Sequence, residues 1–211
     1  AMSIPRGLPL SGPDYTLQIH STAYGGRDTL VQKQGNELTI DRPGVVEDYK
    51  ITLGQDSILI EKGNGHRAEI RREGQGVVIE RPTVAAGDVA IRYTPGRLEV
   101  DRQAAFQDVS YELAGGDLTI KREAAGKDVA LRRTEDGFSI ERPGYRPDLT
   151  IKLDGPLADE GLDMTVWAPR LGLEPEGYAL VDRFLKQGLN PEDLLTVTQD
   201  GDVILWDRAL R

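Results

Sequence analysis

An arginine and an aspartate bracket one loop after another along this chain. The five pairs are Arg42 with Asp48, Arg81 with Asp88, Arg102 with Asp108, Arg122 with Asp128, and Arg142 with Asp148. A carboxylate at the end of a loop accepts hydrogen bonds from backbone N–H groups, and a guanidinium can bind a carboxylate through two hydrogen bonds. We therefore interpret the pairs first as structural clamps that close the loops.

A row of carboxylates at equivalent positions has two further chemical interpretations. One is a calcium site between stacked copies, but calcium takes about 6–8 oxygen ligands, and one Asp beside one Arg per copy supplies few of them. The other is a carbohydrate-binding or carbohydrate-acting face that uses Asp88, Asp108 and Asp128. This second interpretation rests on an analogy with carbohydrate-active β-helices, which place carboxylates on one face.

The paired residues belong to a repeat of about 20 residues. Apolar triplets recur at steps of 19 to 21 residues, and a second short segment follows each triplet, which gives about seven copies over residues 15–155. Apolar and polar residues alternate within these segments, and that period is typical of a half-buried β-strand. The third copy departs from the pattern, because Arg67 stands where the other copies have the Asp. The triplets begin at Leu17, Leu38, Ile58, Val77, Leu98, Leu118 and Phe138.

Two arrangements fit a copy with two short strands. In an antiparallel meander the short turns, such as TPGR and AGGD, close β-hairpins. In a β-solenoid each copy is one coil, and the coils enclose their own core. Because the repeat offers no helix to cover the apolar face of a meander, we favour the solenoid. The predicted fold is an all-β repeat protein, a β-solenoid of about seven two-strand coils with a small α+β C-terminal cap; the alternative is an antiparallel β-hairpin meander, single-layer or barrel-like.

The stretches VAAGDVAIRYTPGRLEV and DVSYELAGGDLTIKREAAGKDVAL resemble the coils of filamentous-haemagglutinin-type exoproteins of Gram-negative bacteria. The resemblance covers residues 84–131, and more loosely the rest of 15–155. It implies a right-handed parallel β-helix that serves as an adhesin or as a stalk for contact-dependent toxins. The stretch RYTPGRLEV also resembles a tyrosine–aspartate repeat of Rhs-type toxin shells, although most copies here lack the tyrosine.

The repeat pattern ends near residue 156. We therefore divide the chain into an N-terminal extension (1–14), a β-repeat domain (15–155) and a C-terminal module (156–211). In this module the sequence predicts a helix from Pro175 to about Gln187, a short helical turn from Asn190, and a hairpin around Asp200-Gly201.

The C-terminal module has two candidate roles. Repeat arrays need terminal caps that cover the last repeat, so the first interpretation is a cap. The second is a partner-binding module, because aromatic residues dominate the binding energy of protein interfaces. Its candidate contact residues are Trp167, Tyr178, Phe184 and Trp206.

Composition excludes several classes of function. The formal net charge of −9 argues against nucleic acid and anionic membranes as partners. No apolar run is long enough for a transmembrane helix, and the start of the sequence lacks the pattern of a signal peptide. The absence of cysteine excludes disulfides, Cys-ligated zinc and thiol catalysis.

The sequence holds no recognisable catalytic motif. His20 and His66 occupy non-equivalent positions and lack a third ligand at zinc spacing, and no G-x-S-x-G, P-loop or G-x-G-x-x-G sequence is present. Acidic pairs such as Asp159/Glu160 and Glu192/Asp193 are more simply solvated charges than a general acid and base. We expect no enzyme activity, no catalytic residue, no metal and no cofactor.

These observations predict a non-enzymatic structural or interaction segment of a bacterial secreted or surface protein, such as an adhesin or stalk-like rod. The alternatives are a carbohydrate-binding or carbohydrate-acting β-helix, and a shell or assembly part of a toxin or phage-like particle. We expect a protein partner or self-assembly, with a glycan as an alternative ligand, no nucleic acid and no membrane insertion. A secreted or cell-surface location is favoured over the cytoplasm, and we expect the chain to be part of a larger protein.

Overall fold

The chain forms two compact units. The computed structural model describes residues 7–20, 28–44, 47–115, 117–123, 128–135, 137–142, 148–152 and 175–210. The N-unit comprises Pro5–Asp88 and Asn190–Trp206, and the C-unit comprises Ala1–Ile4, Val89–Leu189 and Asp207–Arg211. Each unit therefore combines repeat strands with part of the C-terminal segment, whereas the sequence pattern divides the chain only at residues 14 and 155.

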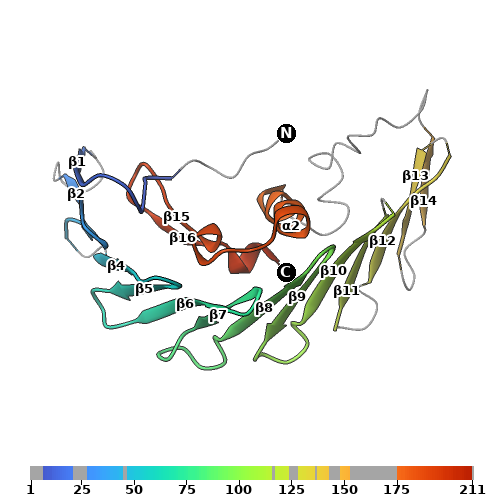
Figure 1. Cartoon of the computed structure of the whole chain (residues 1–211), viewed down its shortest axis with the longest axis horizontal. Helices are drawn as coiled ribbons and strands as arrows, with labels where there is room; N and C mark the ends of the chain where they lie inside the picture. The colour runs from blue at the N-terminus through green and yellow to red at the C-terminus, as the bar shows by residue number, and fades with distance from the viewer. Residues whose placement is uncertain are drawn as a thin grey trace. The chain divides into compact units, whose positions relative to one another are not determined.

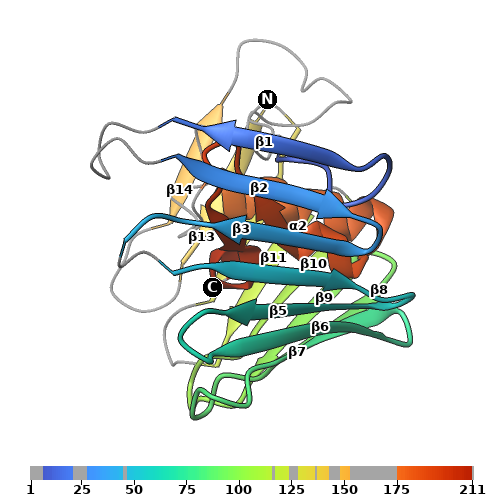
Figure 2. The ribbon, with the colours of Figure 1, turned by 90° about the vertical axis from the view of Figure 1, so that its left-hand side faces the viewer.

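The repeat strands of the N-unit form an antiparallel meander. Each strand pairs with the next one along the chain, and the view in Figure 2 shows them in this order. The strands are β1 (Tyr15–Ile19), β2 (Thr29–Gln34), β3 (Glu37–Asp41), β4 (Tyr49–Leu53), β5 (Ser57–Lys62), β6 (Arg67–Glu73) and β7 (Gly76–Glu80).

The C-unit repeats the same arrangement, again with antiparallel pairs in chain order (Figure 1). Its strands are β8 (Val89–Thr94), β9 (Arg97–Arg102), β10 (Val109–Ala114), β11 (Asp117–Arg122), β12 (Val129–Arg133), β13 (Gly137–Glu141) and β14 (Leu149–Lys152). All predicted triplets from Leu38 to Phe138 lie in strands, so the all-β repeat is confirmed.

The expected solenoid is not confirmed, and the strands instead follow the alternative that the sequence left open. Only two residues separate β2 from β3 and β6 from β7, and Gly35 and Gly74 adopt positive φ angles of 59° and 62° there. Such two-residue loops close antiparallel hairpins, whereas parallel neighbours need a crossover of a dozen or more residues. The turn chemistry thus decides between the two arrangements.

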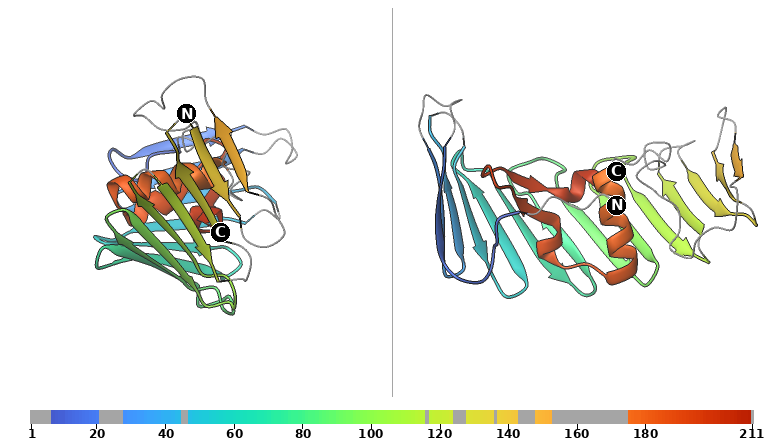
Figure 3. Two further views of the ribbon diagram at one scale, coloured as in Figure 1. Left: turned by 90° about the vertical axis from the view of Figure 1, so that its right-hand side faces the viewer. Right: turned by 90° about the horizontal axis from the view of Figure 1, so that it is seen from above.

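The meander needs a cover for its apolar face, and the C-terminal segment supplies one in each unit. In the C-unit the helix α2 (Pro175–Gln187) contacts β8, β9 and β10, and Figure 3 shows it lying across strands of this unit. In the N-unit the 3-10 helix η3 (Pro191–Leu194) contacts β5 and β6, next to a hairpin of β15 (Leu195–Val197) and β16 (Val203–Leu205). The core comprises alternate strand residues and this cover.

Local sequence explains the elements of the cover. Proline opens α2, and Gly188 with a φ of 84° ends it, where its N–H donates to the Phe184 carbonyl at 3.0 Å. The limits of α2, the helical turn after Asn190 and the hairpin turn at Gly201 all lie where the sequence predicts them. A last 3-10 helix, η4 (Trp206–Leu210), follows β16. No described helix has the length and apolar character that crossing a membrane requires.

Candidate functional site

The loop-closing hydrogen bond is the same in all five predicted pairs. In each pair the backbone N–H of the arginine donates to Oδ1 of the aspartate that precedes the next strand. The N–O distances are 2.8 Å for Arg42–Asp48, 2.8 Å for Arg81–Asp88, 2.8 Å for Arg102–Asp108, 3.0 Å for Arg122–Asp128 and 2.9 Å for Arg142–Asp148. The aspartate thus satisfies a backbone donor at the point where the chain leaves the ladder.

The third copy shows how the loop closes without the aspartate. Its loop is shorter, and the N–H of Lys62 donates to the backbone carbonyl of His66 at 2.8 Å. The donor at the strand end is therefore satisfied in this copy as well, by a carbonyl in place of a carboxylate.

Removal of the aspartate that accepts the loop-closing hydrogen bond should cause a modest and specific loss of stability. We expect Asp108→Ala to lower the free energy of unfolding by about 1–2 kcal/mol, because the Arg102 N–H loses its acceptor. Asp108→Asn keeps an acceptor oxygen and should cost less than half as much. Urea unfolding followed by circular dichroism measures both variants, and equal losses for Ala and Asn would contradict the assignment.

The arginine side chains reach beyond their loops to the C-terminal segment. Because Arg42 continues the alternation of Leu38 and Ile40, its side chain lies on the inner face of the N-unit strands. Its Nη2 donates to the Gly201 carbonyl and, at 2.6 Å, to Oδ1 of Asp202, both in the β15–β16 turn. The expected guanidinium–carboxylate clamp is thus replaced, at Arg42, by contacts to a segment distant in the sequence.

The C-unit uses Arg102 in the same way. Its Nη2 donates to the backbone carbonyl of Asp207 in η4, and its Nη1 lies 3.6 Å from Oδ2 of the same residue. The two side chains are only 7% and 2% exposed, so this is a buried ion pair. A strand-end cation therefore holds part of the C-terminal segment in each unit.

The predicted aromatic contact residues lie partly in the core. Phe184 is fully buried in the C-unit, and Trp206 is 8% exposed. The indole Nε1 of Trp206 donates to Oγ1 of Thr196 at 2.8 Å, which satisfies its polar atom inside the N-unit. Trp167 and the side chain of Tyr178 lie outside the described residues. The two described aromatic residues therefore contribute to packing of the cover in this structure.

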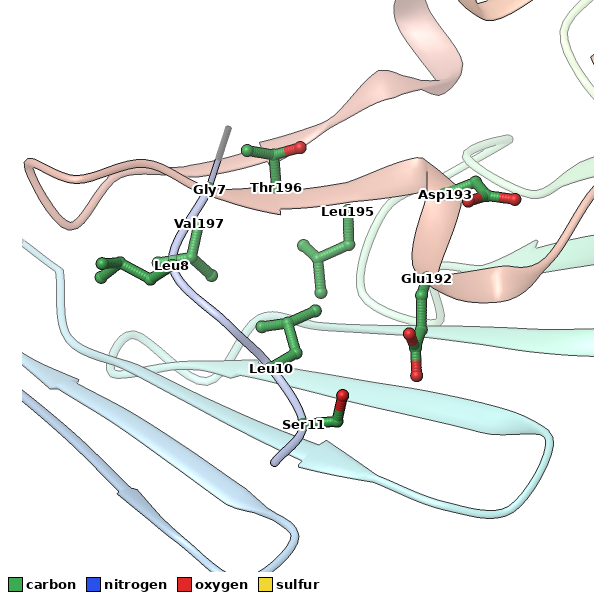
Figure 4. A pocket seen from close by; sticks show the side chains of 9 residues that line it. All are labelled: Gly7, Leu8, Leu10, Ser11, Glu192, Asp193, Leu195, Thr196 and Val197. Carbon is green, nitrogen blue, oxygen red and sulfur yellow. The ribbon is translucent and has the colours of Figure 1, made fainter. Parts of the chain in front are cut away.

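N-terminal residues between 7 and 11 line a small cavity together with η3 and β15. Its volume is about 230 Å³, and Figure 4 shows Leu10 and Leu195 pointing toward each other across it, with the Glu192 carboxylate farther along. The N–H of Leu8 donates to the Val197 carbonyl at 2.6 Å. The N-terminal residues therefore lie along the edge of β15.

A buried lysine anchors the residues that lead into β1. Lys33 Nζ donates to the carbonyls of Gly12 at 2.6 Å and Gly35 at 3.0 Å, and it lies 3.6 Å from Asp14 Oδ1. Its side chain is 2% exposed. The alternation of Thr29, Val31 and Lys33 places a lysine at a core position of its strand, and this is the one sequence signal that would have found it.

The outer faces of the strands carry ion pairs. In the C-unit, Arg92 of β8 lies 2.6 Å from Asp101 of β9, and Arg97 of β9 lies 2.8 Å from Glu112 of β10 and 2.8 Å from Glu99 of its own strand. Hydrogen bonds from Arg97 to Glu99 and Glu112 raise the pKa of its guanidinium. The two pairs that join neighbouring strands, Arg92–Asp101 and Arg97–Glu112, stabilise a solvated face.

A shallow groove of about 430 Å³ lies on the outer face of the C-unit. Two of the predicted carboxylates, Asp108 and Asp128, line it together with Ser110, Lys121 and Glu123. Both carboxylates already accept the loop-closing N–H groups. No three His, Asp or Glu side chains among the described residues are arranged to hold a metal ion, so the calcium interpretation finds no ligand cluster there.

One buried polar atom in the C-unit was not expected from the sequence. Tyr111 is fully buried on the inner face of β10, and its hydroxyl has no hydrogen-bond partner. Burial raises the pKa of Tyr111 to about 12, against the opposing effect of the Arg122 and Arg102 charges. In the sequence, only its place in the alternation of DVSYEL marks it as a core residue.

Comparison with known proteins adds no assignment. No family model, no curated protein and no solved structure matches this chain.

Proposed function

We propose that this chain is a non-enzymatic structural protein: a β-repeat scaffold that holds a polypeptide segment against the inner face of its strands, as a shell or assembly part does. One observation carries the proposal. In both units a cation at the end of a repeat strand binds carbonyl and carboxylate groups of the C-terminal segment, Arg42 at Gly201 and Asp202, and Arg102 at Asp207.

The repeat supports this role because it supplies the same chemistry in each copy from the Leu38 triplet onward. In these copies a basic residue follows the triplet on the inner-face side of the alternation, so cations lie beside the apolar rows; these residues are Arg42, Lys62, Arg81, Arg102, Arg122 and Arg142. A polypeptide offers the complementary groups, since apolar side chains fill the rows and carbonyl or acidic groups meet the cations. Charge-assisted hydrogen bonds of this kind fix the orientation of the bound segment.

The antiparallel pairing favours a scaffold over a self-sufficient rod. A solenoid encloses its own core, whereas an antiparallel meander needs a second layer on its apolar face. The proposed role therefore makes the inner face a binding face that this chain fills with its own residues 175–210. The adhesin-like rod and the carbohydrate-binding β-helix stay predictions of the sequence alone.

Cleavage of the full-length protein tests whether the scaffold holds the segment without a covalent link. A protease recognition sequence is inserted between residues 155 and 175, and the purified protein is cut and applied to a size-exclusion column. We expect the C-terminal fragment to co-elute with the repeat fragment. Arg42→Gln should speed its dissociation about tenfold or more, because charge-assisted hydrogen bonds contribute about 1.5–3 kcal/mol.

The matched control is Arg132→Gln, which removes an exposed arginine that pairs with Glu141 at 2.9 Å on the outer face. It should leave dissociation unchanged. Immediate separation of the wild-type fragments, or equal dissociation of the Arg42 and Arg132 variants, would overturn the proposal.

A further inference from the structure

The first strand of the N-unit is an edge strand without the usual protection. Among the described strands β1 pairs with β2 alone, on one side. Its sequence, YTLQI, contains no charged residue and no proline, whereas every strand from β2 to β14 carries at least one charge. Natural proteins protect sheet edges with charges, prolines or bulges, because an open edge pairs readily with another chain. The edge strand β1 has neither a charge nor a proline.

Leu17 shows the consequence of the open edge. Its side chain is 38% exposed, whereas the equivalent residues of the next copies, Leu38, Ile58 and Val77, are 2%, 2% and 1% exposed. Leu17 points to the same face as these residues, because it lies opposite the buried Val31. The difference is therefore not one of orientation, and a further strand beside β1 would bury the apolar surface that Leu17 exposes.

We propose that β1 pairs antiparallel with β1 of a second copy of this chain, about a two-fold axis at Leu17. The arrangement places Leu17 opposite its counterpart, and Thr16 of each copy opposite Gln18 of the other. The pairing is self-complementary, which a two-fold dimer requires. It meets no like-charge repulsion because the strand is uncharged.

The residues that flank β1 complement one another in the same register. Asp14 of each copy falls opposite His20 of the other, at both ends of the paired strands. Both side chains are exposed, at 64% and 70%. Asp14 is held in place, since its Oδ1 accepts the N–H of Gly35 at 2.9 Å, and His20 Nδ1 contacts Asp28 at 2.9 Å. A carboxylate thus meets an imidazole twice, and the register with Leu17 at the axis is the one that achieves this.

The dimer goes beyond the proposed scaffold role and does not depend on it, because β1 lies outside the contacts of Arg42 and Arg102 with the C-terminal segment. Strand addition of this type derives its affinity from main-chain hydrogen bonds and its specificity from alternate side chains. With five residues in β1 we expect a weak dimer that forms in the micromolar to millimolar range.

Single-cysteine variants of the full chain test the register directly, because the protein contains no cysteine of its own. In Leu17→Cys the two thiols lie on directly opposite residues, and oxidation should give a disulfide-linked dimer on a non-reducing gel. In Thr16→Cys and Gln18→Cys the like residues of the two copies are diagonal neighbours, roughly 7–8 Å apart, which is too far for a disulfide. These two variants should stay monomeric under the same oxidation.

Charge variants at two exposed positions provide a test that leaves the inner face untouched. Thr16 and Gln18 point outward and are exposed, so their substitution should not affect folding. T16K/Q18K places lysines opposite lysines and should weaken dimerisation at least tenfold in sedimentation equilibrium. T16E/Q18K differs only in the sign of one charge, places Glu opposite Lys twice, and should restore or strengthen the dimer.

Three results would overturn the proposal. They are a wild-type protein that stays monomeric at millimolar concentration, equal cross-linking at positions 16, 17 and 18, and assemblies that grow beyond dimers. The last result would indicate head-to-tail pairing of β1 with a different strand of the second copy.

Discussion

Replacing Asp207 with alanine should lower the free energy of unfolding by about 3–5 kcal/mol, the loss expected when one partner of a buried ion pair is removed. The Asp207 carboxylate faces Arg102 Nη1 at 3.6 Å, and both side chains are almost completely buried. The variant leaves the guanidinium in a low-dielectric interior without this counter-charge. Because desolvation of a charge is costly, this loss exceeds that of the loop-closing aspartates, whose carboxylates are more exposed.

The double variant R102M/D207L separates the charge effect from packing. Removing both partners leaves no uncompensated charge, and such replacements are often close to neutral. We expect the double variant to be clearly more stable than Asp207→Ala, despite carrying two substitutions. Urea unfolding of the full chain, followed by near- and far-ultraviolet circular dichroism, measures both. An additive loss in the double variant would show that the ion pair is not the origin of the effect.

Much of the fold follows from local sequence because the signals are local. The alternation around Leu38 and Ile40 sets a strand and its buried face, and the loop-ending aspartates follow from turn chemistry. The helix α2 is bounded by its proline and by Gly188. Each of these features depends only on residues that are close to it in the sequence.

The pairing of the strands was harder to predict because a solenoid and a meander share the same alternation. The two-residue turns at Gly35 and Gly74 contain the decisive information, but the missing cover of the apolar face argued against hairpins. That cover comes from the C-terminal segment, which is distant in the sequence from the strands that it contacts. The contact of Arg42 with Asp202, for example, joins residues 160 positions apart. The repeat that contains Arg42 does not indicate which distant residue the arginine will contact.

The buried polar residues were missed for a related reason. Lys33 and Asp207 have charged side chains, which are expected at the surface unless a partner is present. Their partners lie in other elements, the N-terminal residues for Lys33 and β9 for Asp207. A lysine at a core position of an alternating strand indicates a buried charge, but it does not identify the groups that accept its hydrogen bonds.

Tyr111 should make the folded protein sensitive to alkaline pH. Its hydroxyl is buried without a hydrogen-bond partner, and burial raises its pKa to about 12. An unfolded chain ionises tyrosine near pH 10. Below this value both states are protonated and stability is unaffected. Above it the unfolded state ionises first, so the free energy of unfolding falls by about 1.4 kcal/mol per pH unit until the folded state also ionises, about 3 kcal/mol in all.

Tyr111→Phe removes this dependence and the buried hydroxyl together. Near neutral pH the variant should be as stable as the wild type or up to about 1–2 kcal/mol more stable, because an unsatisfied buried polar group is costly. Between about pH 9 and pH 12 the advantage of the variant over the wild type in free energy of unfolding should grow by about 3 kcal/mol.

Tyr49→Phe is the matched control. Burial also raises the pKa of Tyr49, but that side chain is only partly buried, so the difference in free energy of unfolding between this variant and the wild type should change less with pH. Urea unfolding at a series of pH values measures all three proteins. An advantage of the Tyr111 variant that stays constant with pH would mean that the hydroxyl ionises in the folded state as easily as in the unfolded chain, and that the inner face of β10 admits water.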